Sequence, residues 1–292
     1  MPSLKEVKSR ITSVVSTQQI TKAMKMVAAA KLRKSQERVV QMRPFAQKLN
    51  GLLQNLSAAG SDGPNWYSAA REERKVLIIA VSSDRGLCGG FNSAIFKAVI
   101  RLIDGKYASQ HRQKNVTILP VGKKASEFFT KRNFPVVNDY ALIFSDLSFE
   151  KVADAASYLM EGFRRGDYDK IEIVYNEFKN VATQLLRTEQ FLPVLPLAKG
   201  KRTEETDYIY QPNQEEIITG LIPKSLKVQL FKAVLDSNAA ENGARMTAMD
   251  KATENAGELL KDLRLSYNRT RQAAITKEIL EIVAGAEALK SA

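Results

Sequence analysis

Apolar residues recur at alternating spacings of three and four positions along the first 57 residues. The series is Leu4, Val7, Ile11, Val14, Ala28, Leu32, Val39, Met42, Ala46, Leu49, Leu53 and Leu56. Such spacing is typical of the seam along which one helix packs against another in a coiled coil. We therefore predict a single long helix over this region. Pro44 is expected to kink that helix without ending it, because the repeat continues beyond it.

Polar residues occupy the middle of this seam, namely Gln18, Thr21, Lys25 and Ser35. Around them Ile20, Met24 and Val27 form a second apolar stripe. From this pattern we expect the contact face of the helix to shift away from the polar positions at this level.

Residues 60–72 contain two glycines and a proline and are expected to form a boundary loop. Residues 75–192 then alternate between strand and helix patterns. The expected strands are residues 76–81, 116–121, 171–175 and 184–187, and the expected helices are residues 92–104, 123–131 and 149–166. This alternation predicts a Rossmann-like α/β domain with a mainly parallel sheet. Residues 193–214 carry prolines and charges and are expected to form a loop with one short extended piece.

A second long helical pattern runs from about residue 215 to residue 289, and Gly220 and Pro223 are expected to disturb its start. Its seam is Met246, Met249, Thr253, Ala256, Leu260, Leu263 and Tyr267. The unbroken part would be about 100 Å long at ~1.5 Å per residue, too long to lie inside a small globule. We predict that the two seams pair as an antiparallel coiled coil, so that residues 1–59 and 213–292 are helical parts and residues 60–212 are the α/β domain.

The segment SSDRGLCGGFN, residues 82–92, joins the first strand to the next helix, where phosphate-binding loops also lie. Its spacing argues against such a loop. Dinucleotide sites need G-x-G-x-x-G, and triphosphate sites need G-x-x-x-x-G-K-[ST]. Here G-L-C-G-G is followed by Phe91 and Asn92, without a lysine for a phosphate. We expect a tight turn between strand and helix, and no bound cofactor.

Composition adds a strong positive charge. The 292 residues include 44 Lys and Arg against 32 Asp and Glu, a formal net charge of +12, which favours nucleic acid, anionic lipid or an acidic protein as partner. Cys88 is the only cysteine, so there is no internal disulfide and a reducing compartment fits. His111, the only histidine, lies in a polar stretch expected to be a loop, and a His/Cys metal site or histidine catalysis is not favoured. We expect neither a membrane span nor a secretion signal.

Four stretches resemble the gamma subunits of F-type rotary ATP synthases. They are ITKAMKMVAAAKLRKSQ (20–36), SSDRGLCGGFN (82–92), ARMTAMDKATENAGELL (244–260) and YNRTRQAAITKEILEIVAGAEAL (267–289). The last contains the signature I-T-x-E-I-x-E-I-x-x-G-A-x-A, from Ile275 to Ala288. The resemblance covers both ends and the middle of the chain, in the order that the family has.

The resemblance implies a central-stalk rotor without catalytic, cofactor or metal sites of its own. The terminal helices would form an axle inside a ring of three alpha and three beta subunits, and the α/β domain would contact the epsilon subunit and the membrane c ring. Proton-driven rotation of the c ring would then drive the beta subunits through their nucleotide states. The subunit would be peripheral, at the cytoplasmic face of a bacterial inner membrane. Chloroplast members carry a regulatory cysteine pair that this chain lacks.

The resemblance also assigns contact residues. The residues that would contact the beta subunit's catch are Arg271, Gln272, Thr276 and Glu278, and those near its acidic loop are Met24, Lys25, Arg33 and Arg245. Tyr208 and Tyr210 match a segment that touches the c ring. The alternative is that the helical residues are solvated or pair the two helices, and that the tyrosines belong to an ordinary edge strand.

Two other classes of protein would also account for part of the sequence. A basic coiled coil could bind nucleic acid through phosphate contacts, but no aromatic residue interleaves with the basic residues of 22–38. A nucleotide-dependent enzyme using residues 82–92 fails on the spacing of its glycines. We therefore expect no nucleic-acid partner.

Overall fold

The computed structural model describes residues 3–58, 67, 71–181, 183–194 and 214–290. These residues form two compact units, one made of residues 1–27 and 246–292 and the other of residues 28–245. Two long helices contribute to both units, α1 (Leu4–Ala58) and α6 (Gln214–Lys290). The predicted boundary loop lies largely outside the described residues, as does most of the predicted loop after the last strand.

The unit of residues 28–245 contains a four-stranded sheet with the order β2-β1-β3-β4. The strands are β1 (Val76–Val81), β2 (Val116–Val121), β3 (Lys170–Phe178) and β4 (Gln184–Leu192). β1 pairs in parallel with β2 and with β3, and β4 is antiparallel to β3, so the predicted mainly parallel sheet is confirmed. The first two strands have the predicted bounds. β3 and β4 are longer than predicted, because their pairing continues through polar residues such as Asn176 and Glu189 that break the apolar run.

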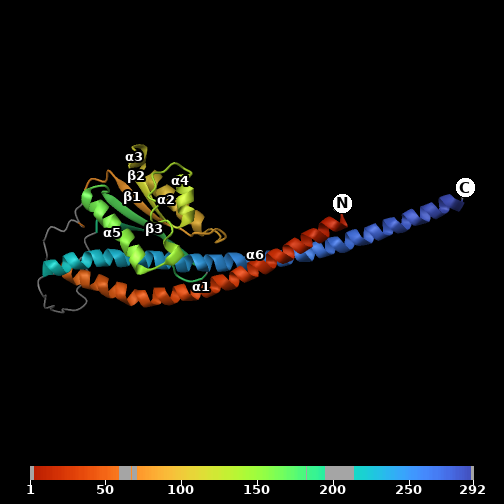
Figure 1. The fold of residues 1–292 in the computed structure, drawn as a ribbon, viewed down its shortest axis with the longest axis horizontal. Coiled ribbons are helices and arrows are strands. Elements are labelled where there is room, and N and C mark those ends of the chain that lie inside the picture. The colour runs from red at the N-terminus through yellow and green to blue at the C-terminus, as the bar shows by residue number, and fades with distance from the viewer. Residues whose placement is uncertain (1–2, 59–66, 68–70, 182, 195–213, 291–292) are drawn as a thin grey trace. The chain divides into compact units, whose positions relative to one another are not determined.

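Helices cover both faces of this sheet (Figure 1). α2 (Phe91–Lys106) and α4 (Lys123–Thr130) lie on one side, while α5 (Phe149–Arg165) and the early part of α6 pack on the other. α5 begins after Ser148, whose hydroxyl accepts from the backbone N–H of Lys151, and ends at Gly166 with a φ of 80°. The predicted helices agree with these bounds to within two residues.

His111 lies on a short helix, α3 (Ala108–Arg112), and the prediction of a loop there is wrong. Its sequence is ASQHR, which has no apolar periodicity and so gives no sign of a helix. The imidazole is exposed and stacks on Phe134, with ring centroids 5.0 Å apart. The only other element between the named strands and helices is a 3-10 turn, η1 (Ile143–Asp146), among the residues described.

In the unit of residues 28–245, α1 and α6 run antiparallel. Asn238 Nδ2 donates to Ser35 Oγ at 3.3 Å, and further along α1 Ala46 and Leu49 pack with Val228. α6 starts at Gln214 and continues through Gly220 and Pro223, so these residues do not end the helix. Pro44 likewise lies inside α1.

In the unit of residues 1–27 and 246–292, the same two helices are again antiparallel, because Gln18 contacts Thr253 and Lys25 contacts Asp250. Within this unit α6 continues well past the first turn of α1 (Figure 1). No helix in the described part of the chain is long and apolar enough to cross a membrane.

The expected shift of the contact face of α1 does not occur. Ile20 is 60% exposed and Val27 is 57% exposed, whereas Thr21 of the original seam is buried. The seam therefore keeps one face throughout, and the polar side chains remain in it because they find partners there. Periodicity alone could not show this, since it does not reveal which residues lie opposite.

Candidate functional site

The polar positions of the seam form one hydrogen-bonded layer between α1 and α6. Thr253 Oγ1 donates to the carbonyl of Met249 at 2.7 Å and lies 2.8 Å from Thr21 Oγ1. Gln18 Nε2 donates to the carbonyl of Thr253 at 3.4 Å. We call Gln18, Thr21 and Thr253 the polar layer. A buried polar layer costs stability relative to an apolar one, but it favours a single register of the two helices.

The candidate residues of α1 for the acidic-loop contact differ in their surroundings. Lys25 Nζ lies 2.5 Å from Asp250 Oδ1, at the half-exposed border of the seam. Arg33 Nε is 3.4 Å from Glu37 Oε1, and both of these side chains are exposed. Met24 is half-buried. Exposed ion pairs contribute little stability and exchange easily, so both cations remain able to attract a second acidic group.

The candidate catch residues lie along the exposed end of α6. Arg271, Gln272, Thr276 and Glu278 are all exposed, and Thr276 Oγ1 donates to the carbonyl of Gln272 at 2.9 Å. Large apolar side chains are exposed beside them, namely Ile275, Ile279, Leu280, Ile282 and Val283. Exposed apolar residues on several sides of one helix are typical of an interaction surface.

The loop of residues 82–92, which we call the 82–92 loop, supplies the acceptors for the start of α4. Asp84 Oδ1 accepts from the N–H of Lys123 at 3.0 Å, and Ser82 Oγ accepts from the N–H of Ala125 at 2.9 Å. The carbonyl of Ser83 accepts from the N–H of Lys124 at 3.1 Å. The N-terminus of α4 is thus capped by side-chain and backbone acceptors of the loop, among them a carboxylate.

The same loop is bonded internally to α2. Asn92 Oδ1 accepts from the N–H of Ser83 at 3.0 Å, and Asn92 Nδ2 donates to Ser83 Oγ at 2.8 Å and to Cys88 Sγ at 3.3 Å. Cys88 of the loop has a buried side chain. Leu87 and Gly89 have positive φ values of 66° and 59°, which make the turn tight.

Arg245 of α6 also donates hydrogen bonds to the 82–92 loop. Its Nη1 donates to the carbonyl of Gly86 at 2.6 Å, and its Nη2 donates to the carbonyl of Arg85 at 3.1 Å. The guanidinium also pairs with Glu241, one turn earlier on α6. The 82–92 loop thus presents carbonyl oxygens to a cation, whereas a phosphate-binding loop presents N–H groups to an anion.

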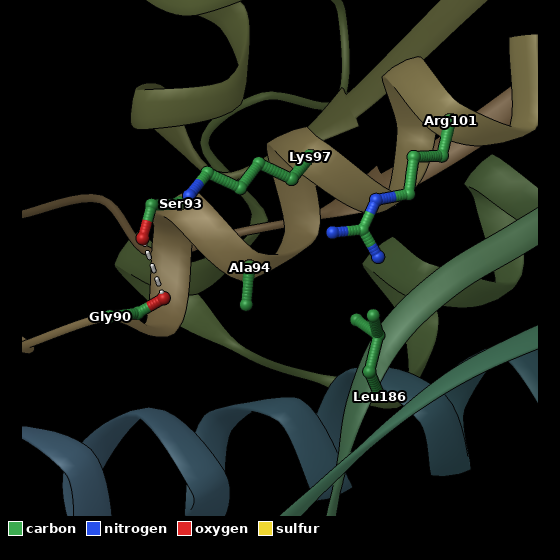
Figure 2. Close-up of a pocket in the computed structure, with 6 residues that line it drawn as sticks. All are labelled: Gly90, Ser93, Ala94, Lys97, Arg101 and Leu186. Carbon is green, nitrogen blue, oxygen red and sulfur yellow. Dashed lines mark hydrogen bonds between the residues drawn. The ribbon is translucent and has the colours of Figure 1, made fainter. Parts of the chain in front are cut away.

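An open hollow of about 280 Å³ lies beside this loop, between α2 and β4 (Figure 2). Its lining is Gly90, Ser93, Ala94, Lys97, Arg101 and Leu186. Lys97 and Arg101 are four residues apart and so lie on the same side of α2, while Ser93 Oγ donates back to the carbonyl of Gly90 at 2.9 Å. The hollow is therefore a positively charged surface rather than an enclosed binding cavity.

A buried carboxyl group lies where α6 packs on the sheet. Asp236 is 1% exposed, and its Oδ1 has no hydrogen-bond partner among the described residues. Burial raises the pKa of Asp236 to about 6, while Lys232 and Arg43 partly oppose this and Glu177 and Glu189 add to it. Desolvation disfavours the charged form of a carboxyl group, which explains the direction.

The chain is similar along its whole length to proteins of one family. A family model described as ATP synthase matches residues 3–289. The ATP synthase gamma chain of Cytophaga hutchinsonii is 57% identical over 296 residues and covers 100% of both chains. That of Chlorobaculum parvum is 50% identical over 291 residues, covering 99% of this chain and 100% of its own.

Solved structures agree in fold. A chain of the central stalk and c-ring structure of Tetrahymena thermophila mitochondrial ATP synthase is 27% identical, with a TM-score of 0.57 over 80% of this chain and 99% of its own. A chain of Euglena gracilis mitochondrial ATP synthase is 21% identical, with a TM-score of 0.66 over 98% of this chain and 94% of its own. Two long helices that pair, with an α/β sheet between them in the sequence, define the class of rotary central-stalk subunits. The chain belongs to the ATP synthase gamma chain family, and it serves as the central-stalk rotor of that enzyme.

The structure places the candidate residues at three separate locations. Lys25 lies at the border of the seam, Arg245 lies against the 82–92 loop, and the catch candidates lie at the exposed end of α6. Tyr208 and Tyr210 lie outside the described residues. Sequence reasoning missed Glu241, whose i, i+4 spacing to Arg245 was the available signal, and Asp84, for which local sequence held no signal of its distant partner.

Proposed function

We propose that this subunit couples proton-driven rotation of a membrane c ring to the conformational cycle of catalytic beta subunits, in ATP synthesis and hydrolysis. The proposed partners are three alpha and three beta subunits, the epsilon subunit and the c ring, and the proposed location is the cytoplasmic face of a bacterial inner membrane. The observation that carries the proposal is the exposed end of α6, where Ile275, Ile279 and Ile282 stand uncovered beside polar candidates for a partner contact.

We further propose that the subunit is not itself catalytic. The 82–92 loop supports this, because the carbonyls of Arg85 and Gly86 face a guanidinium, whereas a phosphate-binding loop presents N–H groups. The isolated chain is expected to hydrolyse no ATP. Turnover by the pure chain well above a buffer blank, with contaminants excluded, would contradict this proposal.

The proposed contacts fall into three groups. Arg271, Gln272, Thr276 and Glu278 are proposed to hydrogen-bond a loop of the beta subunit. Met24, Lys25, Arg33 and Arg245 are proposed to lie near its acidic loop, where charge pairs at the surface can form and break as the rotor turns. Tyr208 and Tyr210 are proposed to touch the c ring. The division of the chain at residues 59/60 and 212/213 is likewise a proposal.

The experiment is substitution at the end of α6 in the assembled enzyme. Arg271→Ala should lower ATP hydrolysis and ATP-driven proton pumping about tenfold or more, because a hydrogen bond involving a charged group is worth about 1.5–3 kcal/mol. Arg269→Ala, an exposed cation on the same helix, is the matched control and should retain most of the activity. Equal activities of Arg271→Ala and wild type, in complexes of equal subunit composition, would contradict the proposed catch contact.

A further inference from the structure

Arg245 of α6 donates hydrogen bonds to the backbone of the 82–92 loop, and Glu241 of α6 holds its guanidinium. The side chains are 13% and 14% exposed, so the pair is largely shielded from water. Arg245 Nε donates to Glu241 Oε1 at 2.9 Å, while its two other nitrogens reach the carbonyls of Gly86 and Arg85. Four of the five N–H groups of the guanidinium are used in these contacts, counting a second bond to Glu241.

From this geometry we propose that Arg245, oriented by Glu241, is a mechanical link between α6 and the α/β domain in addition to their apolar packing, so that part of the torque applied to the domain passes into the helix through the 82–92 loop. The torque part of this inference rests on the proposed rotor function. The link itself rests on geometry alone.

Only an arginine fits this position. The planar guanidinium places donors toward two carbonyls and one carboxylate at the same time, and a lysine ammonium on a flexible stem does not reproduce that fork. Glu241 keeps the group in place. Burial raises the pKa of Glu241, and the charge and hydrogen bonds of Arg245, with the charge of Lys31, oppose this rise, so Arg245 helps to keep the carboxylate ionised.

Hydrogen bonds tie the loop to the elements around it. Ser83 bonds to Asn92 at the start of α2, and Asp84 bonds to the N-terminus of α4. A force on the carbonyls of Arg85 and Gly86 therefore reaches β1, α2 and α4 through short hydrogen-bonded paths. A loop without these bonds would absorb the same force by bending.

α6 is also seated against the sheet at this turn. Gly243 lies between the two members of the pair, and a Cβ added there would be 3.6 Å from Phe178 Cε2 and 3.8 Å from the carbonyl oxygen of Val181. Phe178 ends β3, which is parallel to β1, so its end lies at the same edge of the sheet as the 82–92 loop. The helix thus contacts the domain by packing and by hydrogen bonds within one turn.

Cys88 provides a local reporter of the link. It is the only cysteine of the chain, it is 2% exposed, and its sulfur accepts from Asn92 Nδ2 within the loop. Alkylation by iodoacetamide requires the loop to open, so the rate at fixed pH measures how firmly the loop is held. In the isolated full-length chain no beta subunit is present, and a change in rate cannot come from a lost partner contact.

We expect Glu241→Gln and Arg245→Lys each to raise the alkylation rate of Cys88 at least tenfold, while remaining below the rate of the urea-unfolded chain. Arg33→Lys, an exposed arginine that also pairs with a glutamate one turn away, is the matched control and should stay within twofold of wild type. If Arg245→Lys fails to fold, the milder Glu241→Gln decides. A Glu241→Gln rate within twofold of wild type would overturn the link.

The torque role is tested in the assembled enzyme with Glu241→Gln, since Glu241 is not among the residues proposed to touch beta. ATP-driven proton pumping should fall at least threefold relative to ATP hydrolysis. Faster Cys88 alkylation with an unchanged ratio of pumping to hydrolysis would overturn the torque role. That result would leave the rotor function intact, because that function is tested separately by Arg271→Ala.

Discussion

Replacing Asp236 by asparagine should stabilise the chain at neutral pH and lose this effect in acid. The Asp236 carboxyl is buried between α6 and the sheet, and its pKa is raised from 3.8 to about 6. The folded chain therefore holds this proton more tightly than the unfolded chain does. Stability falls as pH rises from about 4 to 6, and above pH 6 the full penalty is present.

The size of the penalty follows from the pKa difference. Roughly two pKa units at about 1.4 kcal/mol each give about 3 kcal/mol. Asparagine carries no charge, but its amide also needs partners where Oδ1 of Asp236 has none among the described residues. We therefore expect Asp236→Asn to gain about 1–3 kcal/mol at pH 7.5 and little or nothing at pH 4.

The assay is thermal unfolding of the full-length chain, followed by circular dichroism at several pH values between 4 and 8. At about 2 °C per kcal/mol for a chain of this size, the expected rise at pH 7.5 is about 2–6 °C. Asp104→Asn, an exposed carboxyl on α2, is the control and should change the midpoint by less than about 1 °C. The reasoning is refuted if Asp236→Asn lowers the midpoint at pH 7.5, or if its effect is the same at pH 4 and pH 7.5.

Three further outcomes are expected. Gly122→Ala should lower the free energy of unfolding by about 3 kcal/mol or more, because Gly122 has a φ of 107° and an added methyl group would lie 2.4 Å from the carbonyl oxygen of Ser82. A loss of less than about 1 kcal/mol in thermal unfolding would contradict this. In a double-mutant cycle on the free energy of unfolding, Thr21→Val and Thr253→Val should show a coupling energy of about 1 kcal/mol. Strictly additive effects would argue against a hydrogen bond between the two side chains. Disulfide tethering to the surrounding ring at Leu263→Cys should block ATP hydrolysis more than tethering at Ala286→Cys, because a helix end frays whereas the paired seam does not. Equal residual rates of the two tethered variants, with reduction as the control, would refute this.

The buried face of α1 was predictable, because the apolar spacing alone places Ala28, Leu32 and Val39 on one side of the helix. The surroundings of the polar layer were not. A stripe containing Ile20 and Val27 looked like a better contact face than one containing Thr21, and only the position of Thr253 on α6 explains why the polar face stays inside. Two-helix contacts between residues more than 200 positions apart leave no local signal.

In the 82–92 loop, too, local features were predictable from the sequence and contacts between distant residues were not. Glycine spacing was sufficient to argue against a phosphate loop, and the buried runs of β1 and β2 were predicted with their observed bounds. The hydrogen bonds of Asp84 to the start of α4 and of Arg245 to the 82–92 loop were not predicted, because each side chain bonds to backbone groups 39 or more residues away. Propensity and periodicity describe neighbours in the chain, whereas these side chains respond to neighbours in space.

The pairing of α1 with α6 has a consequence for synthesis on the ribosome. Gln18 and its partner Thr253 are 235 positions apart, so at about 5–20 residues per second α1 emerges about 10–50 s before the helix that covers it. During this interval the apolar seam residues Val7 and Leu32 face water or a chaperone. The interrupting polar residues shorten each uninterrupted apolar stretch, which reduces the tendency of one nascent chain to associate with the same seam of another. The residues that select the correct partner late in synthesis thus also limit incorrect ones early.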